Sequence, residues 1–311
     1  MDSLSLILDD IRLTGVEYLY VAGTRPWGFR LDTGGVAAFH MVMQGEARVE
    51  ISSKEVLTLG PGDVLMIPEL PHTVTDMEGG GAVLHDLNSE FNGHRIDPLM
   101  LGHGGIDTLL LSGRCCFDAE LGKPLLAALP SHVIIRGIDK NPPEWLRIGL
   151  EFLSQEVQQR RPGRDVIINR LIDILFVECL RDYVESLPEG SGSWLLALRD
   201  AALSAALSAI HSRPEYPWTV PELASVACLS RSAFAERFSD VMGQPPLSYL
   251  QAHRMRIAAW QLRHTQQPVC RIAELVGYAS ETAFSQAFKR QYGNTPSRFR
   301  NEGESAPART A

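Results

Sequence analysis

The sequence lacks the features that would assign it to a membrane or secreted class. None of its apolar runs reaches the roughly 18 residues that a membrane-spanning helix needs. The first ten residues contain no Lys or Arg, which argues against a secretory signal peptide. The five cysteines are an odd number without zinc-finger spacing, as in proteins of a reducing compartment. We therefore expect a cytoplasmic protein without membrane contact, and its 311 residues suggest two domains.

Basic residues are too few overall for an ordinary nucleic-acid-binding protein. The net charge is −8, but the two halves of the chain differ strongly. Residues 1–194 contain 16 Lys and Arg against 28 Asp and Glu, a net charge of −12. Residues 195–300 contain 12 against 7, a net charge of +5. Because DNA phosphates attract basic surfaces, we expect DNA contacts only in the C-terminal half.

The C-terminal half contains one short pattern twice, 50 positions apart. In each copy a serine that can cap a helix precedes two phenylalanines four residues apart, and then glycine and proline, which end a helix. A shorter apolar helix and a turn, at Cys228 or Gly277, come before each serine. This arrangement predicts two helix-turn-helix units. The repeated residues are Ser230, Phe234, Phe238, Gly243, Pro246 and Tyr249 in the first copy and Ser280, Phe284, Phe288, Gly293, Pro296 and Phe299 in the second.

The exposed side of the second helix in each copy carries side chains suited to DNA. Ser, Thr, Gln, Glu and Arg can bind base edges in a major groove, whereas Lys289 and Arg290 near a helix end suit phosphates. The alternative is an ordinary solvated face of a helical bundle, which does not account for a duplicated pattern with matching ends. The predicted DNA-contacting residues are Arg231, Ser232, Glu236, Arg237, Glu281, Thr282, Ser285, Gln286, Lys289 and Arg290.

Residues 194–300 resemble the DNA-binding domain of the AraC/XylS family of bacterial transcription regulators. The resemblance implies seven helices, of which a long one over about 247–264 joins two helix-turn-helix units. It also implies a homodimer formed through helices that precede this domain. The matching stretches are W-T-V-P-E-L-A (218–224), S-R-S-A-F-A-E-R-F (230–238), P-L-S-Y-L-Q-A-H-R-M (246–255), I-A-E-L-V-G-Y-A-S (272–280) and A-F-K-R-Q-Y-G-N-T-P (287–296).

Residues 1–138 are expected to form a β domain. Short runs of β-forming residues alternate with Gly-rich turns, which is typical of a sandwich or barrel. The stretch 60–63, Gly-Pro-Gly-Asp, followed by His72, resembles the second cupin motif, and His40 lies in a fragment of the first. Val42 stands where the enzyme pattern has a second histidine, and no glutamate follows at the expected spacing. We therefore expect a cupin-like β-barrel that acts as a sensor or scaffold, without enzymatic activity and without a cofactor.

Two other functions of this domain stay open at the level of sequence. His40 and His72 could line an effector or metal pocket, as in a metal-dependent cupin enzyme fused to a DNA-binding domain. The simpler interpretation is that both histidines form hydrogen bonds inside the domain. One of the adjacent Cys115 and Cys116 could be an exposed thiol that senses oxidants, with Arg114 lowering its pKa. The simpler interpretation is that both cysteines are structural.

Residues 139–187 are expected to be helical and to serve packing or dimerisation. One helix is predicted over 143–160 and a second over 165–187, where apolar residues recur at spacings of three and four. Such an apolar face must cover the β domain, a second subunit or both. Residues 188–193 form a predicted flexible linker, and residues 301–311 a predicted disordered tail.

These observations predict a two-domain α+β protein, with an N-terminal cupin-like β-barrel plus helices and a C-terminal all-α domain with two helix-turn-helix units. The predicted function is that of a sequence-specific DNA-binding transcription regulator. Its two recognition helices would face successive major-groove segments about one turn (~34 Å) apart. Double-stranded DNA is the expected partner, with RNA polymerase and a small-molecule effector as further candidates. The N-terminal domain would bias DNA binding as a sensor.

Overall fold

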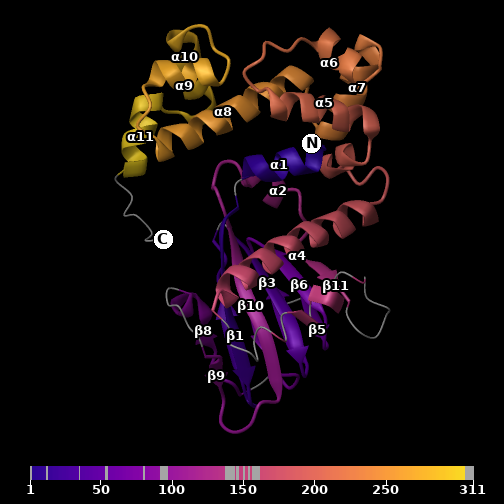
Figure 1. Cartoon of the computed structure of the whole chain (residues 1–311), viewed down its shortest axis with the longest axis vertical. Helices are drawn as coiled ribbons and strands as arrows, with labels where there is room; N and C mark the ends of the chain where they lie inside the picture. Colours follow the sequence, from indigo (N-terminus) through magenta and orange to yellow (C-terminus); the bar gives the residue numbers. More distant parts are fainter. Residues whose placement is uncertain are drawn as a thin grey trace. The chain divides into compact units, whose positions relative to one another are not determined.

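A computed structural model describes residues 2–304, except 12, 35, 53–54, 80, 92–96, 137–143, 145–146, 150, 153–154 and 156–161. The chain divides into two compact units, each assembled from segments that are distant in the sequence (Figure 1). The finer boundaries that we predicted between domains, segments and linker stay predictions. The sheet unit comprises Leu13–Phe117 and Leu125–Glu185, and the helical unit comprises Met1–Arg12, Asp118–Pro124 and Ser186–Ala311.

The strands of the sheet unit form two sheets. One has the order β11-β6-β3-β10-β1-β9 and the other the order β5-β4-β7-β2-β8. Most neighbouring strands are antiparallel, whereas the short edge strands β9 and β8 run parallel to β1 and β2. The strands are β1 (Leu13–Gly23), β2 (Gly28–Leu31), β3 (Val36–Gln44), β4 (Ala47–Ser52), β5 (Glu55–Leu59), β6 (Val64–Pro68), β7 (His72–Thr75), β8 (His85–Asp86), β9 (Leu99–Leu101), β10 (Thr108–Phe117) and β11 (Val133–Ile135).

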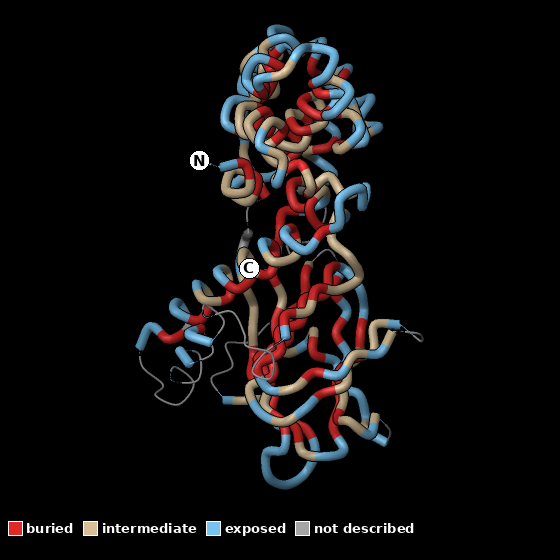
Figure 2. Tube along the Cα trace, turned by 90° about the vertical axis from the view of Figure 1, so that its right-hand side faces the viewer, coloured by how far each residue is buried: buried red, intermediate tan, exposed pale blue. Residues whose placement is uncertain are grey.

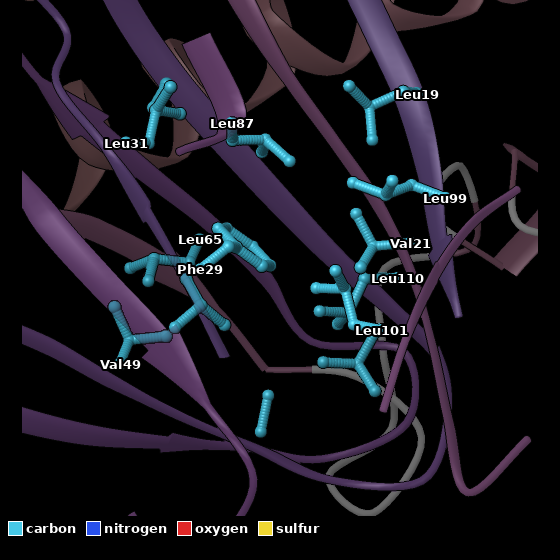
Figure 3. Close-up of a cluster of buried hydrophobic side chains, with 14 of the residues drawn as sticks. Leu19, Val21, Phe29, Leu31, Val49, Leu65, Leu87, Leu99, Leu101 and Leu110 are labelled. Carbon is cyan, nitrogen blue, oxygen red and sulfur yellow. The ribbon is translucent and has the colours of Figure 1, made fainter. Parts of the chain in front are cut away.

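The predicted closed barrel is wrong for the described residues, because both sheets are open. The edge strands β8, β9 and β11 have only two or three residues each, too few to continue a hydrogen-bonded ladder around a barrel. The sheets instead face each other across a shared apolar core. Side chains from β1, β9 and β10 of one sheet meet side chains from β2 and β4 of the other (Figure 3). The coarser prediction of a domain built from many short strands is confirmed.

The core between the two sheets is completely removed from solvent at its centre (Figure 2). Trp27, Phe29, Leu31 and Leu65 are each at most 1% exposed. The rings of Trp27 and Phe29 stack with their centroids 6.3 Å apart. Truncating one such aromatic side chain would cost about 3–5 kcal/mol. Side-chain packing, and not closure of the hydrogen bonding, therefore holds the two sheets together.

Helix α4 (Arg164–Ser186) matches the amphipathic helix predicted before the linker. Its apolar face packs on the sheet unit, where the ring of Phe176 lies 5.2 Å from that of Phe117 at the end of β10. Other apolar positions remain outside, because Ile167 and Ile174 are 36% and 54% exposed. The helix therefore covers part of its own domain and still presents apolar side chains to solvent.

Seven α-helices occupy residues 201–304, as the family resemblance implies. The long helix α8 begins one residue earlier than predicted and ends where predicted. It contributes to two hydrophobic clusters of the described residues, with Tyr249 and Leu250 in one and Met255 and Leu262 in the other. The helices are α5 (Ala201–Ser212), α6 (Val220–Val226), α7 (Arg231–Met242), α8 (Pro246–His264), α9 (Val269–Leu275), α10 (Glu281–Tyr292) and α11 (Pro296–Glu304).

The N-terminal segment is a helix, although we assigned it to the β domain. Helix α1 (Ser3–Ile11) begins after Asp2, whose carboxylate accepts a hydrogen bond of 2.9 Å from the amide of Ser5. Ile7 and Ile11 are buried, and α1 packs beside α5 in the helical unit (Figure 1). Leu4, Ile7, Leu8 and Ile11 follow helical spacing, so the sequence contains a local signal for α1 that the assignment of residues 1–138 to a β domain overlooked.

The last helix extends into the start of the segment 301–311 that we predicted as a tail. Helix α11 continues past residue 301, because Glu302 in its last turns binds the guanidinium of Arg298 one turn earlier at 2.9 Å. Residues 305–311, and most of the helix predicted over 143–160, lie outside the described residues. The described chain also contains the short helix α2 (Lys123–Leu126). No helix among the described residues is long and apolar enough to cross a lipid bilayer.

The turns before α7 and α10 provide a matched pair of substitutions. Cys228 and Gly277 both adopt the left-handed conformation, with φ of 54° and 81°. A Cβ at residue 277 would collide with the carbonyl oxygen of Glu215 and lie 2.8 Å from the guanidinium of Arg254. We expect Gly277→Ala to lower the free energy of unfolding of the helical unit by roughly 1–3 kcal/mol. Amide hydrogen exchange in α9 and α10 measures this loss.

The control is the opposite exchange in the other copy. Cys228→Gly should change the free energy of opening of α6 and α7 by less than about 1 kcal/mol, because relief of left-handed strain offsets the greater freedom of the unfolded chain. If Gly277→Ala costs no more than Cys228→Gly, the left-handed turn at residue 277 is not required.

Candidate nucleic-acid interface

The two copies of the repeated pattern adopt the same local structure. A short turn joins α6 to α7, and another joins α9 to α10. Ser230 and Ser280 each accept a hydrogen bond from the amide three residues later, at 3.3 and 3.4 Å, and so cap helices of 12 residues. Gly243 and Gly293 end these helices in the left-handed conformation, with φ of 68° and 77°. The predicted caps and stops of both copies are therefore present.

The buried side of each capped helix determines which side faces solvent. Phe234 and Phe238 of α7 are completely buried, with ring centroids 5.5 Å apart. Phe284 and Phe288 of α10 are also completely buried, with ring centroids 5.7 Å apart. Because residues four apart share one face of a helix, each phenylalanine pair anchors one face in a core. The opposite face of each helix is left exposed, at equivalent positions of the two copies.

All four residues that we predicted on α7 are exposed, namely Arg231, Ser232, Glu236 and Arg237. The guanidinium of Arg237 also binds the carboxylate of Asp200 at 2.6 Å. That carboxylate also caps α5 by accepting hydrogen bonds from its first amides. Arg237 thus has a partner inside the helical unit, and its predicted contact with DNA stays a prediction.

The exposed face of α10 brings together most of the residues that we predicted in the second copy. Together with Thr295 they line a surface depression. Arg290 is exposed on the same helix. The repeat did not indicate that threonine, because proline occupies the equivalent position 245 in the first copy. The residues that line the depression are Glu281, Thr282, Ser285, Gln286, Lys289 and Thr295.

The sheet unit places His40 and His72 side by side in its interior. Nδ1 of His72 donates to the carbonyl oxygen of Leu70 at 2.9 Å, so its Nε2 accepts from Nε2 of His40 at 2.7 Å. Nδ1 of His40 in turn accepts from the hydroxyl of Ser112 at 3.0 Å. All four ring nitrogens therefore have a partner within the domain. In this arrangement neither ring offers a lone pair to a metal ion.

Both buried rings are held in the neutral form. Burial and the neighbouring His72 keep the pKa of His40 well below its usual value. Burial also lowers the pKa of His72 to about 4, although its bond to the Leu70 carbonyl works in the opposite direction. A proton added to either ring would disrupt the chain of hydrogen bonds in a site without solvent.

The environment of the adjacent cysteines in β10 opposes thiolate formation. Cys115 is buried and Cys116 is half-buried. Burial raises the pKa of Cys115, and burial followed by the nearby Glu17 raises that of Cys116. Arg114 opposes this second shift only in part, because its guanidinium forms an ion pair with Glu17. Reactive cysteines have a lowered pKa, so these surroundings do not favour a redox sensor.

Comparison with known proteins covers both halves of the chain. The family "Cupin" matches residues 2–185, and the family "Helix-turn-helix domain" matches residues 223–302. The HTH-type transcriptional regulator AlkR of Acinetobacter baylyi is 42% identical over 306 residues, which cover 97% of this chain and 100% of that protein. The RCS-specific HTH-type transcriptional activator RclR of Escherichia coli is 30% identical over 266 residues, which cover 85% and 84%. Among solved structures, the DNA-binding domain of AdpA in complex with a target DNA is 27% identical with a TM-score of 0.34, covering 36% of this chain and 99% of that one.

The neutral histidine pair predicts how the sheet unit responds to acid. The folded-state pKa values of His40 and His72 lie below the usual value of 6.5. Their contribution to stability is therefore complete above pH 6.5 and is lost as the pH falls from 6.5 towards 4. We expect a loss of about 1.4 kcal/mol per pH unit for each ring within this window. Amide hydrogen exchange in β3 and β7 of the full chain measures it.

The double variant His40→Gln/His72→Gln is the control for this prediction. It removes both titrating rings. The free energy of opening should therefore fall less steeply with falling pH, by about 1.4 kcal/mol per pH unit for each ring removed. The prediction is contradicted if wild type and double variant lose stability equally between pH 6.5 and 4, because other groups would then account for the loss.

Proposed function

The chain belongs to the AraC-type family of DNA-binding transcription regulators with an N-terminal cupin domain, and on this premise we propose that α7 and α10 are its two recognition helices. Each would be the second helix of a helix-turn-helix unit, with α6 and α9 as the first helices. The observation that carries the proposal is the matched exposure of both helices, opposite buried phenylalanine pairs at equivalent positions. One rigid surface of each helix is thereby available to a groove of DNA.

The length of α8 supports simultaneous reading of two groove segments. This helix joins the pair α6 and α7 to the pair α9 and α10 without interruption over 19 residues. At a rise of 1.5 Å per residue it spans about 28 Å. Successive major-groove segments on one side of DNA are about 34 Å apart. A linking helix of this length is therefore of the right scale to carry two recognition helices into consecutive turns.

The side chains on the two exposed faces suggest a division of roles. Arg231 at the start of α7 can bind a guanine through two hydrogen bonds, and Gln286 of α10 can bind an adenine in the same way. Lys289 and Arg290 lie in the last turn of α10 and suit the negatively charged backbone. Phosphate contacts would set the position of the helix, and the base contacts would select the sequence.

The sheet unit is proposed to regulate DNA binding and not to catalyse a reaction. The hydrogen bonds within the histidine pair support a structural role for His40 and His72. An effector would act by favouring one arrangement of the protein over another. Ile167 and Ile174, seven residues apart on α4 and exposed, support a homodimer formed through this helix. RNA polymerase is the further partner through which such a regulator would act on transcription.

Selection of genomic DNA by the full-length protein tests the reading of two sub-sites. Random fragments retained at physiological salt are sequenced, and we expect a motif with two sub-sites about one helical turn (~34 Å) apart. Arg231→Ala should relax sequence preference at one sub-site and Gln286→Ala at the other, each with a loss of ~1–3 kcal/mol. A homodimer would select two copies of this paired motif.

Arg271→Ala is the matched control, since Arg271 is an exposed arginine of α9 that pairs with Glu274. It should retain the wild-type motif. The proposal fails if the motif contains a single sub-site, or if Arg231→Ala and Gln286→Ala both select the wild-type motif unchanged. If two motifs are found and a metabolite extract changes their relative enrichment, the extract contains an effector.

The salt dependence of operator binding distinguishes the roles of two exposed cationic residues, Lys289 and Arg237. Lys289→Ala should weaken binding to all sequences about equally and lower the slope of log affinity against log salt by about 1. Arg237→Ala should leave that slope unchanged and instead destabilise the helical unit, because its guanidinium binds Asp200. If Arg237→Ala lowers the slope as much as Lys289→Ala does, then Arg237 contacts a phosphate in the complex, as its sequence position predicts.

A further inference from the structure

The helical unit contains a compact cluster of metal-binding side chains that does not belong to the DNA-reading surface. Asp10 of α1 lies against His211 of α5 and His253 of α8. One ligand atom from each residue lies within 4.8 Å of those of the other two. Asp10 and His211 are 201 positions apart in the sequence. No local spacing could have indicated this cluster, and it exists only because α1 packs beside α5.

One member of the cluster is a buried polar group without a hydrogen bond. His253 is 2% exposed, and no described residue hydrogen-bonds its Nε2. That nitrogen points towards the cluster, where it lies 3.5 Å from Oδ2 of Asp10. The ring centroids of His253 and His211 are 4.2 Å apart. Leaving a buried polar atom unpaired costs about 1–3 kcal/mol, so such an atom calls for a partner.

Tyr249 makes the second histidine suitable as a ligand. Nε2 of His211 lies 2.8 Å from the hydroxyl of Tyr249, and its Nδ1 faces the Asp10 carboxylate. A hydroxyl can donate or accept. Without an ion, His211 Nδ1–H donates to Asp10 and the hydroxyl donates to Nε2. With an ion, the same proton moves to Nε2, which then donates to the hydroxyl, and Nδ1 is free to bind metal. Metal-binding histidines generally have such an outer partner.

The local charges are compatible with a cation, although they do not all favour one. Burial first, then His211, Arg256 and Arg254, lower the pKa of His253, so its ring is neutral as a metal ligand must be. The two arginines would repel an ion, whereas the Asp10 carboxylate would attract it. The Asp10 side chain is 29% exposed, which leaves a path from solvent to the cluster.

We propose that Asp10, His211 and His253 bind one divalent transition-metal ion of the zinc class and that this ion fastens α1 to α5 and α8. Two imidazoles and one carboxylate form a donor set that suits zinc, with a fourth position left for water. The ion would supply the partner that Nε2 of His253 lacks. Because α8 also joins the two proposed helix-turn-helix units, the site would connect the N-terminal helix to the DNA-reading half of the chain.

Metal titration of the full-length, chelator-treated protein without a histidine tag tests the site. We expect one equivalent of Zn²⁺ or Co²⁺ per chain, with the Co²⁺ complex showing the strong visible absorption of a four-coordinate ion. Asp10→Asn, His211→Gln and His253→Gln should each weaken binding by at least about tenfold, the lower limit expected even for loss of an outer partner. His264→Gln is the matched control, because this exposed histidine of α8 lies outside the cluster.

A second measurement separates this site from the histidine pair of the sheet unit and from effects on folding. Amide hydrogen exchange in α1 should slow when Zn²⁺ is added to wild type and to His40→Gln, and should not change for Asp10→Asn. Asp10 is the most exposed of the three ligands, so Asp10→Asn is the variant least able to disturb the core.

Three results would overturn the proposal. The first is the absence of stoichiometric Zn²⁺ or Co²⁺ binding to the wild-type protein. The second is unchanged affinity in the three cluster variants, or loss of the ion in His40→Gln. The third is a bound ion that leaves exchange in α1 unchanged, because α1 would then not be the segment that the ion fastens. In the first two cases the cluster would be a contact between helices that holds no ion.

Discussion

The long helix α8 is the element on which the helical unit depends. Its side chains enter both hydrophobic clusters, so neither pair of short helices has a complete core without it. Arg254 of α8 donates to the carbonyl oxygens of Pro214 and Tyr216 at 2.6 and 2.8 Å and so fixes the loop before α6. Arg300 donates to the carbonyl oxygen of Gln267 at 2.6 Å and fixes the segment before α9. The proposed reading of two groove segments would need this fixed separation.

Buried histidines at two places in the chain are arranged in opposite ways. In the sheet unit, the nitrogens of His40 and His72 all have partners, and the result is a closed chain of hydrogen bonds that rigidifies the interior. In the helical unit, Nε2 of His253 has no hydrogen bond although it is equally buried. The first arrangement leaves no ring nitrogen unpaired, whereas the second leaves Nε2 of His253 for the proposed ion. This contrast moves the expected place of a metal ion from the cupin histidines to the N-terminal helix.

Local signals account for the parts of the structure that the sequence predicted well. Each cap, stop and phenylalanine pair of α7 and α10 involves residues at most four positions apart, so one window of sequence contains the whole physical cause. The many short strands of the sheet unit were recognised from equally local runs of β-forming residues. The closed barrel was an error of another kind, because it depends on how distant segments meet, and the pairing of short edge strands with β1 and β2 leaves no local trace. The omission of α1 was an error about a local signal, since Leu4, Ile7, Leu8 and Ile11 carry helical spacing in the sequence.

The sequence by itself determined the class of the protein, the positions of the capped helices α7 and α10 and the residues on their exposed faces, because helix periodicity and capping are local. Only the tertiary structure decided which of those residues have other tasks, as in the ion pair of Arg237 with Asp200, 37 positions away. It also decided that the sheets stay open, and that Asp10 meets His211 and His253. Such contacts arise from burial of apolar faces, here Ile7 and Ile11 of α1. That burial brings polar side chains together regardless of their distance along the chain.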